Sequence, residues 1–411
     1  MVWPLPDRRL ILRRVLLVLA LLGVACRGEA RQTSANDAAL ARMVDSLRTP
    51  VERAVGLVFT APPRSAMRSK EQVRGYLIRK LDEELPPDRL RGLETTYQLF
   101  GLLPDTLHLR ALLLDLYTEQ VAGFYDPDSA TLFGVAGADP ERLRLVLAHE
   151  MIHALQGQHL RLDSILDDRR NNDRLTAAQA ILEGQATLSS LDVLAPGQDV
   201  AQNPQFWELY REQVRQQQTS MPVFRDAPLI LRESLIFPYL QGAEFMHWWA
   251  QSPFRDTLPY GRRMPQSTEQ ILHPERYARS DLPVVLAYPG ESDVLYEDVL
   301  GENEIRVVLA HLAGSDEVQT VVPLGWGGDR YRLYRTADGP ALVWYAVWDD
   351  TRSADRFLRS AGPGLRHTPR HAYRAALDSL DVGGRPATRY VLAPADWPRW
   401  ESLPSVTVSG R

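Results

Sequence analysis

Apolar residues between positions 37 and 116 recur every three or four residues, which is the spacing of helices that bury one face. Prolines separate these repeats and mark where one helix ends before the next begins. The pattern predicts a helical half-domain with a structural role, made of four helices over residues 40–47, 71–81, 90–100 and 107–117.

A change of pattern near residue 120 predicts a short β-hairpin. Residues 121–125 and 131–135 are rich in β-branched and aromatic side chains, and a proline-containing turn lies between them. The helix that follows has a marked start, with Asp139 as N-cap and Pro140 at the first helical position. Its apolar positions run from 143 to 155 around most of the axis, which is typical of a helix buried in a core.

Further along the chain, the pattern predicts three more helices and then a change of composition near residue 288. These helices cover residues 175–194, 206–218 and 228–251, and the later region mixes strands at 330–334, 341–348 and 388–392 with helices at 352–361 and about 371–380. We therefore expect an α+β protein, with a mostly helical domain over residues 38–285, the hairpin beside its central helix, and a small α+β domain over residues 286–411.

The predicted central helix contains one complete H-E-x-x-H, formed by His149, Glu150 and His153. Histidines four apart lie about 40° apart around a helix and about 6 Å apart along it, so both imidazoles can reach one ion. Two histidines and a glutamate inside a buried helix are costly unless they are partnered or bind a metal. The spacing favours a Zn²⁺ site with Glu150 as general base, rather than a histidine pair retained for packing.

A third protein ligand has two candidates. His159 follows His153 by six residues, as in metzincins, but Gln156 stands where their helix-breaking glycine would be. In an uninterrupted helix His159 would point about 120° away from His153. Glu183 lies in the next helical segment among small residues that allow close helix contact, although it could also be an ordinary solvated acid. Geometry favours Glu183, and His159 stays as the alternative.

Several motifs together resemble a family of uncharacterised bacterial zinc metallopeptidases of gluzincin type. The resemblance extends from about residue 50 to residue 280 and is carried by His149–His159, Glu119–Pro127, Glu183–Thr187, Phe237–Gly242 and Ser267–Tyr277. It implies a zincin-like fold and a zinc-dependent hydrolase with one Zn²⁺ per chain on His149, His153 and Glu183. It names no substrate.

Two residues besides the proposed metal ligands and Glu150 are candidates for contacts with substrate or with the developing oxyanion. Tyr239 lies in the aromatic helix 228–251, where its phenol could donate to an oxyanion or simply complete the core. His273 follows a capping-box pattern, Ser267-Thr-Glu-Gln270, that starts a short helix ended by Pro274. It could contact substrate, or it could interact with the last carbonyls of that helix.

The first 26 residues have the basic and short apolar regions of a secretory signal, and the apolar run is too short for a comfortable membrane span. Cys26, the single cysteine of the chain, follows this run at the position where bacterial lipoproteins are acylated. An incidental cysteine near a cleavage site is the alternative. Residues 27–37 are polar and predict a tether. We expect an exported chain held in the cell envelope by an N-terminal lipid anchor.

Charge and composition narrow the choice of function. The chain of 411 residues has a net charge of −5, and removal of the arginine-rich signal leaves no basic block, so nucleic acid is not an expected partner. The expected function is a zinc metallopeptidase of the envelope acting on peptides or proteins. The alternatives are a lipid-anchored binding or assembly protein with a structural or degenerate metal site, and a hydrolase of an amide that is not a peptide.

Overall fold

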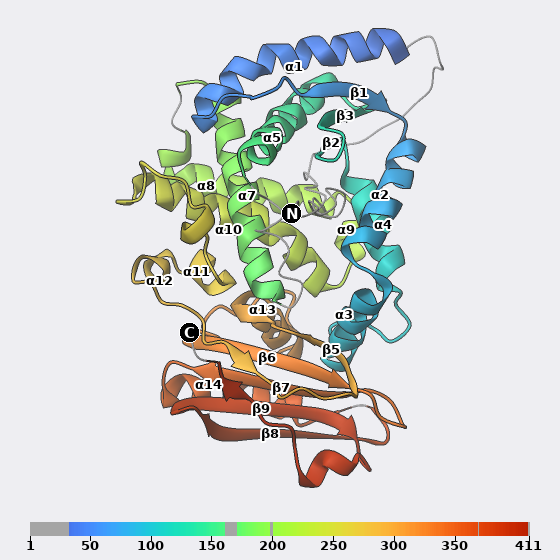
Figure 1. Cartoon of the computed structure of the whole chain (residues 1–411), viewed down its shortest axis with the longest axis vertical. Coiled ribbons are helices and arrows are strands. Elements are labelled where there is room, and N and C mark those ends of the chain that lie inside the picture. The colour runs from blue at the N-terminus through green and yellow to red at the C-terminus, as the bar shows by residue number, and fades with distance from the viewer. Residues whose placement is uncertain (1–32, 161–170, 198–199, 369, 410–411) are drawn as a thin grey trace, which may run out of the picture.

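The computed structural model describes residues 33–160, 171–197, 200–368 and 370–409. Helices occupy one half of the molecule and a five-stranded sheet the other (Figure 1). The helical half contains α1 (Thr33–Val55), α2 (Lys70–Glu84), α3 (Pro87–Leu99), α4 (Leu109–Gln120), α5 (Pro140–His159), α7 (Asn172–Leu194), α8 (Pro204–Thr219), α9 (Pro222–Asp226), α10 (Leu229–Gln251), α11 (Thr268–Leu272) and α12 (Pro274–Ala278). This arrangement confirms the α+β class.

A three-stranded sheet borders α5. The predicted hairpin is present as β2 (Gly123–Asp126) and β3 (Thr131–Val135), and β1 (Arg64–Arg68) adds to it in parallel beside β3. The expectation that residues 37–116 are purely helical is wrong at β1. Its five residues carry no strand alternation, and they form a strand because β3 offers a free edge. Strand β2 is left as the other edge of this sheet.

Helices α7 and α10 cross at unusually close range. A Cβ atom added at Gly242 would lie 2.0 Å from the backbone oxygen of Ala180, and one added at Gly184 would lie 2.2 Å from Gly242. Only glycine permits this approach of two backbones. The crossing fixes Glu183, which directly precedes Gly184, against Tyr239 one turn before Gly242.

The second half is an antiparallel sheet of order β5-β6-β7-β9-β8, covered on one face by helices α13 (Gly301–Leu312) and α14 (Thr351–Leu365). Its strands are β5 (Val294–Asp298), β6 (Trp326–Tyr334), β7 (Ala341–Trp348), β8 (Tyr373–Val382) and β9 (Arg385–Pro394), and the short strands β4 (Leu286–Ala287) and β10 (Thr407–Val408) pair separately. Strands β6, β7 and β9 and helix α14 agree with the sequence prediction.

The helix expected near residues 371–380 is instead strand β8, paired with β9 along its whole length. The run Ala375-Ala376-Leu377 favours a helix locally, but a tight turn after Val382 directs the chain back along β9. Gly383 and Gly384 both have positive φ, at 62° and 80°, as two-residue hairpin turns require. Leu377 faces one side of the sheet and Val382 the other, which is the alternation of a strand.

One hydrophobic cluster extends across the predicted domain boundary at residue 285. It includes Leu113 and Tyr97 from the helical half together with Trp344 and Phe357 from the sheet half. Helix α13 also packs against both α7 and α10. The two halves are therefore held in one arrangement by a shared core. Among the described residues, no helix combines the length and the apolarity needed to cross a membrane.

Candidate metal centre

Helix α5 carries the two histidines into the interior. Its N-terminus is capped by Asp139, whose side chain accepts hydrogen bonds from the amides of Glu141 and Arg142 at 3.0 Å. The middle of the helix is buried on all sides, and the exposed fractions of His149, Glu150 and His153 are 5%, 0% and 1%. Groups this polar are retained in a core only when they have partners or a ligand.

Glu183 on α7 meets both histidines. Its Oε2 lies 3.0 Å from Nε2 of His149 and 3.4 Å from Nε2 of His153. One ligand atom from each residue lies within 4.8 Å of the other two, and no other such group of three occurs among the described residues. The structure thus brings together the two histidines of the motif and the acid favoured as their third partner.

His159 does not join this group. Helix α5 continues without a break to His159, whose ring is exposed and whose Nε2 lies 2.7 Å from the backbone oxygen of Val58. An uninterrupted helix turns this ring away from His149 and His153, as the 100° rotation per residue requires. Glu183 therefore takes the third place, and the His159 alternative is wrong.

The orientation of His153 is fixed by Gln156, a residue that the sequence analysis considered only as the replacement for a glycine. The amide nitrogen of Gln156 donates to the backbone oxygen of Leu182 at 3.0 Å, so its Oε1 must be the acceptor that lies 2.7 Å from Nδ1 of His153. Nδ1 of His153 therefore carries a proton. Its Nε2 faces Oε2 of Glu183 at 3.4 Å and is buried without a hydrogen-bond partner among the described residues.

One carboxylate oxygen of Glu150 is hydrogen-bonded, and the other has no hydrogen-bond partner among the described residues. Its Oε2 accepts a hydrogen bond of 2.8 Å from the backbone amide of Tyr125 at the edge of β2, whereas Oε1 is buried and has no hydrogen-bond partner among the described residues. Burial raises the pKa of Glu150 to about 8, although His153 and the Tyr125 amide act against this shift. A carboxylate so placed can hold a proton near neutral pH.

Glu183 has the opposite electrostatic environment. Burial alone would raise its pKa, but His153 and His149 outweigh burial and hold the pKa of Glu183 at about 2. Burial lowers the pKa of His149, which keeps this imidazole neutral. The pKa values of the two carboxylates in this site therefore lie far apart. Glu183 stays ionised, whereas Glu150 can exchange a proton near neutral pH.

This donor set fits a metal ion. Two imidazole nitrogens and an ionised carboxylate converge, and the buried Nε2 of His153 has no hydrogen-bond partner among the described residues, so an ion could bind there. Sets of this composition suit Zn²⁺ in catalytic sites, where three protein ligands leave one position open. The three residues could hold one ion, with Gln156 as the outer partner that orients His153.

Tyr239 lies beside the group, on α10. Its ring centroid is 6.1 Å from that of His149, and its side chain is hydrogen-bonded to Glu183. Burial raises the pKa of the Tyr239 phenol, and the nearby Glu183 and Glu150 carboxylates raise it further, so the hydroxyl keeps its proton and acts as a donor.

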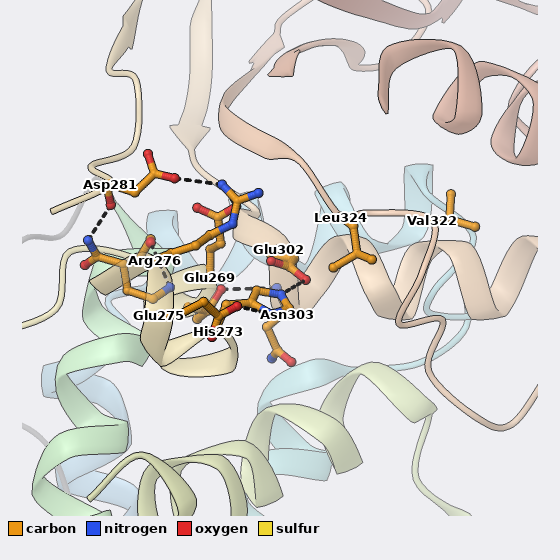
Figure 2. Close-up of polar contacts among 12 residues, drawn as sticks. Glu269, His273, Glu275, Arg276, Asp281, Glu302, Asn303, Val322 and Leu324 are labelled. Atoms are coloured by element: carbon orange, nitrogen blue, oxygen red, sulfur yellow. Dashed lines mark hydrogen bonds and ion pairs between the residues drawn. The ribbon is translucent and has the colours of Figure 1, made fainter. Parts of the chain in front are cut away.

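His273 lies elsewhere. It is at the junction of α11 and α12, and its Nε2 is 2.9 Å from Glu302 at the start of α13 (Figure 2). Thr268 in the same α11 segment contacts Asp173 at the first turn of α7, ten residues from Glu183. Ten helical residues correspond to about 15 Å. The structure therefore groups His273 with the contact between α11 and α13 and not with the metal centre.

The N-terminal predictions concern a part of the chain that the structure leaves undescribed. Cys26, the signal region and residues 27–32 of the tether lie outside the described residues. Helix α1 begins at Thr33, so the last five residues of the predicted tether, 33–37, are helical.

Comparisons with known proteins add little about the centre. Residues 292–391, which extend from β5 to β9, match a domain of unknown function (DUF8575). A crystal structure from Chloroflexus aurantiacus, described as "a putative hydrolase with a novel fold", is similar at 17% sequence identity with a TM-score of 0.42. That alignment covers 62% of this chain and 92% of the other. No protein of curated function is detectably similar in sequence.

Proposed function

We propose that this protein is a zinc metallopeptidase that hydrolyses peptide bonds. The observation that supports the proposal is the placement of Glu150, a buried carboxylate with one unpartnered oxygen, immediately beside two imidazoles and a carboxylate that converge. A purely structural metal site is closed by protein ligands and has no need of a base next to it. Glu150 provides the feature that a hydrolase requires and a binding protein does not.

In the proposed reaction, Glu150 accepts a proton from the water that attacks the substrate carbonyl. It then delivers this proton to the nitrogen of the leaving amine, so that the C–N bond breaks and the carboxylate is regenerated. The hydrogen bond from the Tyr125 amide holds one oxygen of Glu150 and leaves the other, which has no hydrogen-bond partner among the described residues, available to accept a proton. A bound Zn²⁺ supplies Lewis-acid polarisation of the carbonyl and acidification of water.

Tyr239 is the candidate donor for the negative charge that develops on the carbonyl oxygen. Its phenol is protonated and already directed at the centre, where it is hydrogen-bonded to Glu183. Transfer of this hydrogen bond to substrate would stabilise the tetrahedral state selectively. His273 has no place in this scheme because it is engaged with Glu302.

The site of action is proposed from the sequence. A secretory signal ending at Cys26 supports export and N-terminal acylation, which would anchor the folded body to a membrane of the cell envelope. Substrates would then be peptides or proteins of that compartment.

The exchange Glu150→Gln tests the proposal. It keeps size and the hydrogen bond to Tyr125 but removes the base, so zinc content should be unchanged while hydrolysis of a peptide library is lost. Glu141→Gln, at an exposed position in the first turn of the same helix, is the matched control and should keep full activity. Unchanged hydrolysis by Glu150→Gln would overturn the mechanism, and wild-type protein that binds zinc but cleaves no peptide would favour a binding protein or a non-peptide amide.

A further inference from the structure

A cavity of about 190 Å³ has the candidate metal ligand Glu183 and Tyr239 in its wall and extends between α4, α7 and α10 toward residues of α3, α13 and β5. Its wall on α7 is formed by Asn172, Thr176, Gln179 and Glu183, which are spaced by four, three and four residues and so share one helix face. Asn172 and Glu183 are eleven positions apart, which corresponds to a length of about 16 Å along the helix. The cavity is therefore a slot that follows α7 from the candidate metal ligand Glu183 toward the N-terminus of that helix.

The opposite walls come from α4 and α10 and are mainly apolar. Leu109, Leu113 and Tyr117 contribute from one face of α4, and Leu231 and Leu235 contribute from one face of α10. A polar wall of amide and hydroxyl groups thus faces a wall of leucines along the slot. An extended peptide presents the matching surface, since its backbone needs hydrogen bonds on one side while its side chains pack on the other.

Two charged lining residues, Glu304 and Arg89, lie at the end of the slot farthest from the histidines. Glu304 accepts hydrogen bonds from Tyr97 at 2.8 Å and from Asn172 at 2.7 Å, and Arg89 is hydrogen-bonded to Tyr296 in the same region. Between this end and Glu183 the α7 wall carries only Thr176 and Gln179, which are uncharged. The middle of the slot is therefore suited to uncharged side chains.

Gln120 supplies an independent sign of a ligand. It is 2% exposed, it lines the slot, and its amide nitrogen has no hydrogen-bond partner among the described residues. Burying an amide without a partner is unfavourable by itself. Gln120 ends α4 three residues before β2, the strand whose Tyr125 contacts Glu150, so it lies toward the metal-centre end. A carbonyl of a bound peptide would satisfy this amide.

We propose that the slot along α7 binds an extended peptide segment of uncharged residues on one side of the scissile bond. At about 3.3 Å per residue, a length of about 16 Å corresponds to the span of roughly five extended residues along the α7 wall. This inference rests on the proposed peptidase function and specifies its substrate class as peptides that extend several residues from the cleavage point, rather than dipeptides.

Substrate length is the first test. A series of peptides with one to eight uncharged residues on each side of the cleaved bond should show kcat/KM rising with length on one side only and levelling off near five residues. Binding of the same peptides to Glu150→Gln protein, measured by calorimetry without turnover, should tighten over the same lengths. If wild-type protein cleaves peptides at rates independent of length on both sides, the slot is wrong while the peptidase proposal stands. If no peptide is cleaved, both fall.

Two substitutions locate the effect. Leu113→Trp fills the middle of the slot and should collapse the ratio of long-peptide to short-peptide kcat/KM, whereas the same exchange at exposed Leu282 should leave that ratio unchanged. Gln120→Leu should raise the dissociation constant of long peptides about three- to tenfold, which is the loss expected for one hydrogen bond. Because the free amide is unsatisfied, this variant should unfold at the same or higher temperature. Lower stability together with unchanged peptide binding would mean that Gln120 is structural and would overturn the proposal.

Discussion

The Nδ1 atom of His153 lies 2.7 Å from Oε1 of Gln156, one helical turn further along α5. The amide orientation of Gln156 is set by its bond to the backbone of Leu182 on α7, directly before Glu183. The same side chain therefore orients one histidine and links the two helices that supply the candidate metal ligands.

This relationship predicts a loss of metal affinity when Gln156 cannot accept. The exchange Gln156→Met leaves all three ligands in place but frees the His153 ring to rotate or to change tautomer. Zinc affinity, measured by competition with a chelator, should fall about 10–100-fold. The same exchange at exposed Gln205 should have no effect. Equal affinity in the two variants would mean that Gln156 does not support the centre.

The crossing of α7 and α10 predicts that Gly184→Ala destabilises the fold. The added methyl would meet backbone atoms of Gly242 at 2.2 Å, so the helices must separate. We expect the free energy of unfolding to fall by about 1–3 kcal/mol in urea titrations. Gly75→Ala in α2 is the control, because only the flexible end of Arg79 lies near it, at 3.9 Å, and there alanine should be stabilising. Equal stability of Gly184→Ala and wild type would show that the crossing is not tightly packed.

Buried carboxylates near α11 predict a stability that falls with pH. Burial raises the pKa of Asp173 from 3.8 to about 8 and that of Glu269 from 4.5 to about 9, with Glu302 adding to both shifts. Figure 2 shows Glu269 and Glu302 in the same region. Above the unfolded pKa values the unfolded chain releases protons that the folded chain keeps. The stabilisation is complete below about pH 4 and is lost as the pH rises through the folded values of about 8 and about 9.

Thermal unfolding measured between pH 6 and pH 9 checks this expectation. Wild-type protein should unfold at lower temperature as the pH rises, and Glu269→Gln should show a shallower slope because it carries no proton to lose. A slope that is the same for both proteins would contradict the assignment to Glu269.

Tyr239→Phe tests the proposed oxyanion donor. It removes one hydroxyl and leaves the ring against His149, so zinc content should be retained while kcat falls about 10²–10³-fold. Tyr373→Phe, which removes a hydroxyl bonded to Pro340 in the distant sheet, should leave kcat unchanged. Undiminished kcat in Tyr239→Phe would restrict this tyrosine to packing.

Local signals in the sequence predicted much of this candidate centre, because most of its residues belong to motifs that are short and lie within one helix. The N-cap at Asp139, the four-residue spacing of the histidines and the small residues around Glu183 all lie within single helices. Gln156 was missed because its role depends on the carbonyl of Leu182, which belongs to another helix. Gln120 gave no signal at all, since a buried amide without a partner is recognisable only in three dimensions.

The wrong predictions about the fold also concern contacts between segments that are distant in the sequence or that depend on a turn. Strand β1 forms because β3 presents an edge to it, a contact between residues more than sixty positions apart. Strand β8 forms against its local preference because the Gly383-Gly384 turn pairs it with β9. The Gly-Gly pair is itself a signal of a two-residue hairpin turn in the sequence, and it favours a strand at this position more strongly than the Ala-Ala-Leu run favours a helix.

The zinc content of the purified folded chain tests the central claim most directly. Elemental analysis should give one zinc per wild-type chain and one per His159→Gln chain, and far less than one for Glu183→Gln, since within the described part of the chain Glu183 is the one residue that completes a ligand group with the two histidines. Wild-type protein without zinc after dialysis against zinc and a weak chelator, or Glu183→Gln protein that keeps a full equivalent, would contradict the account.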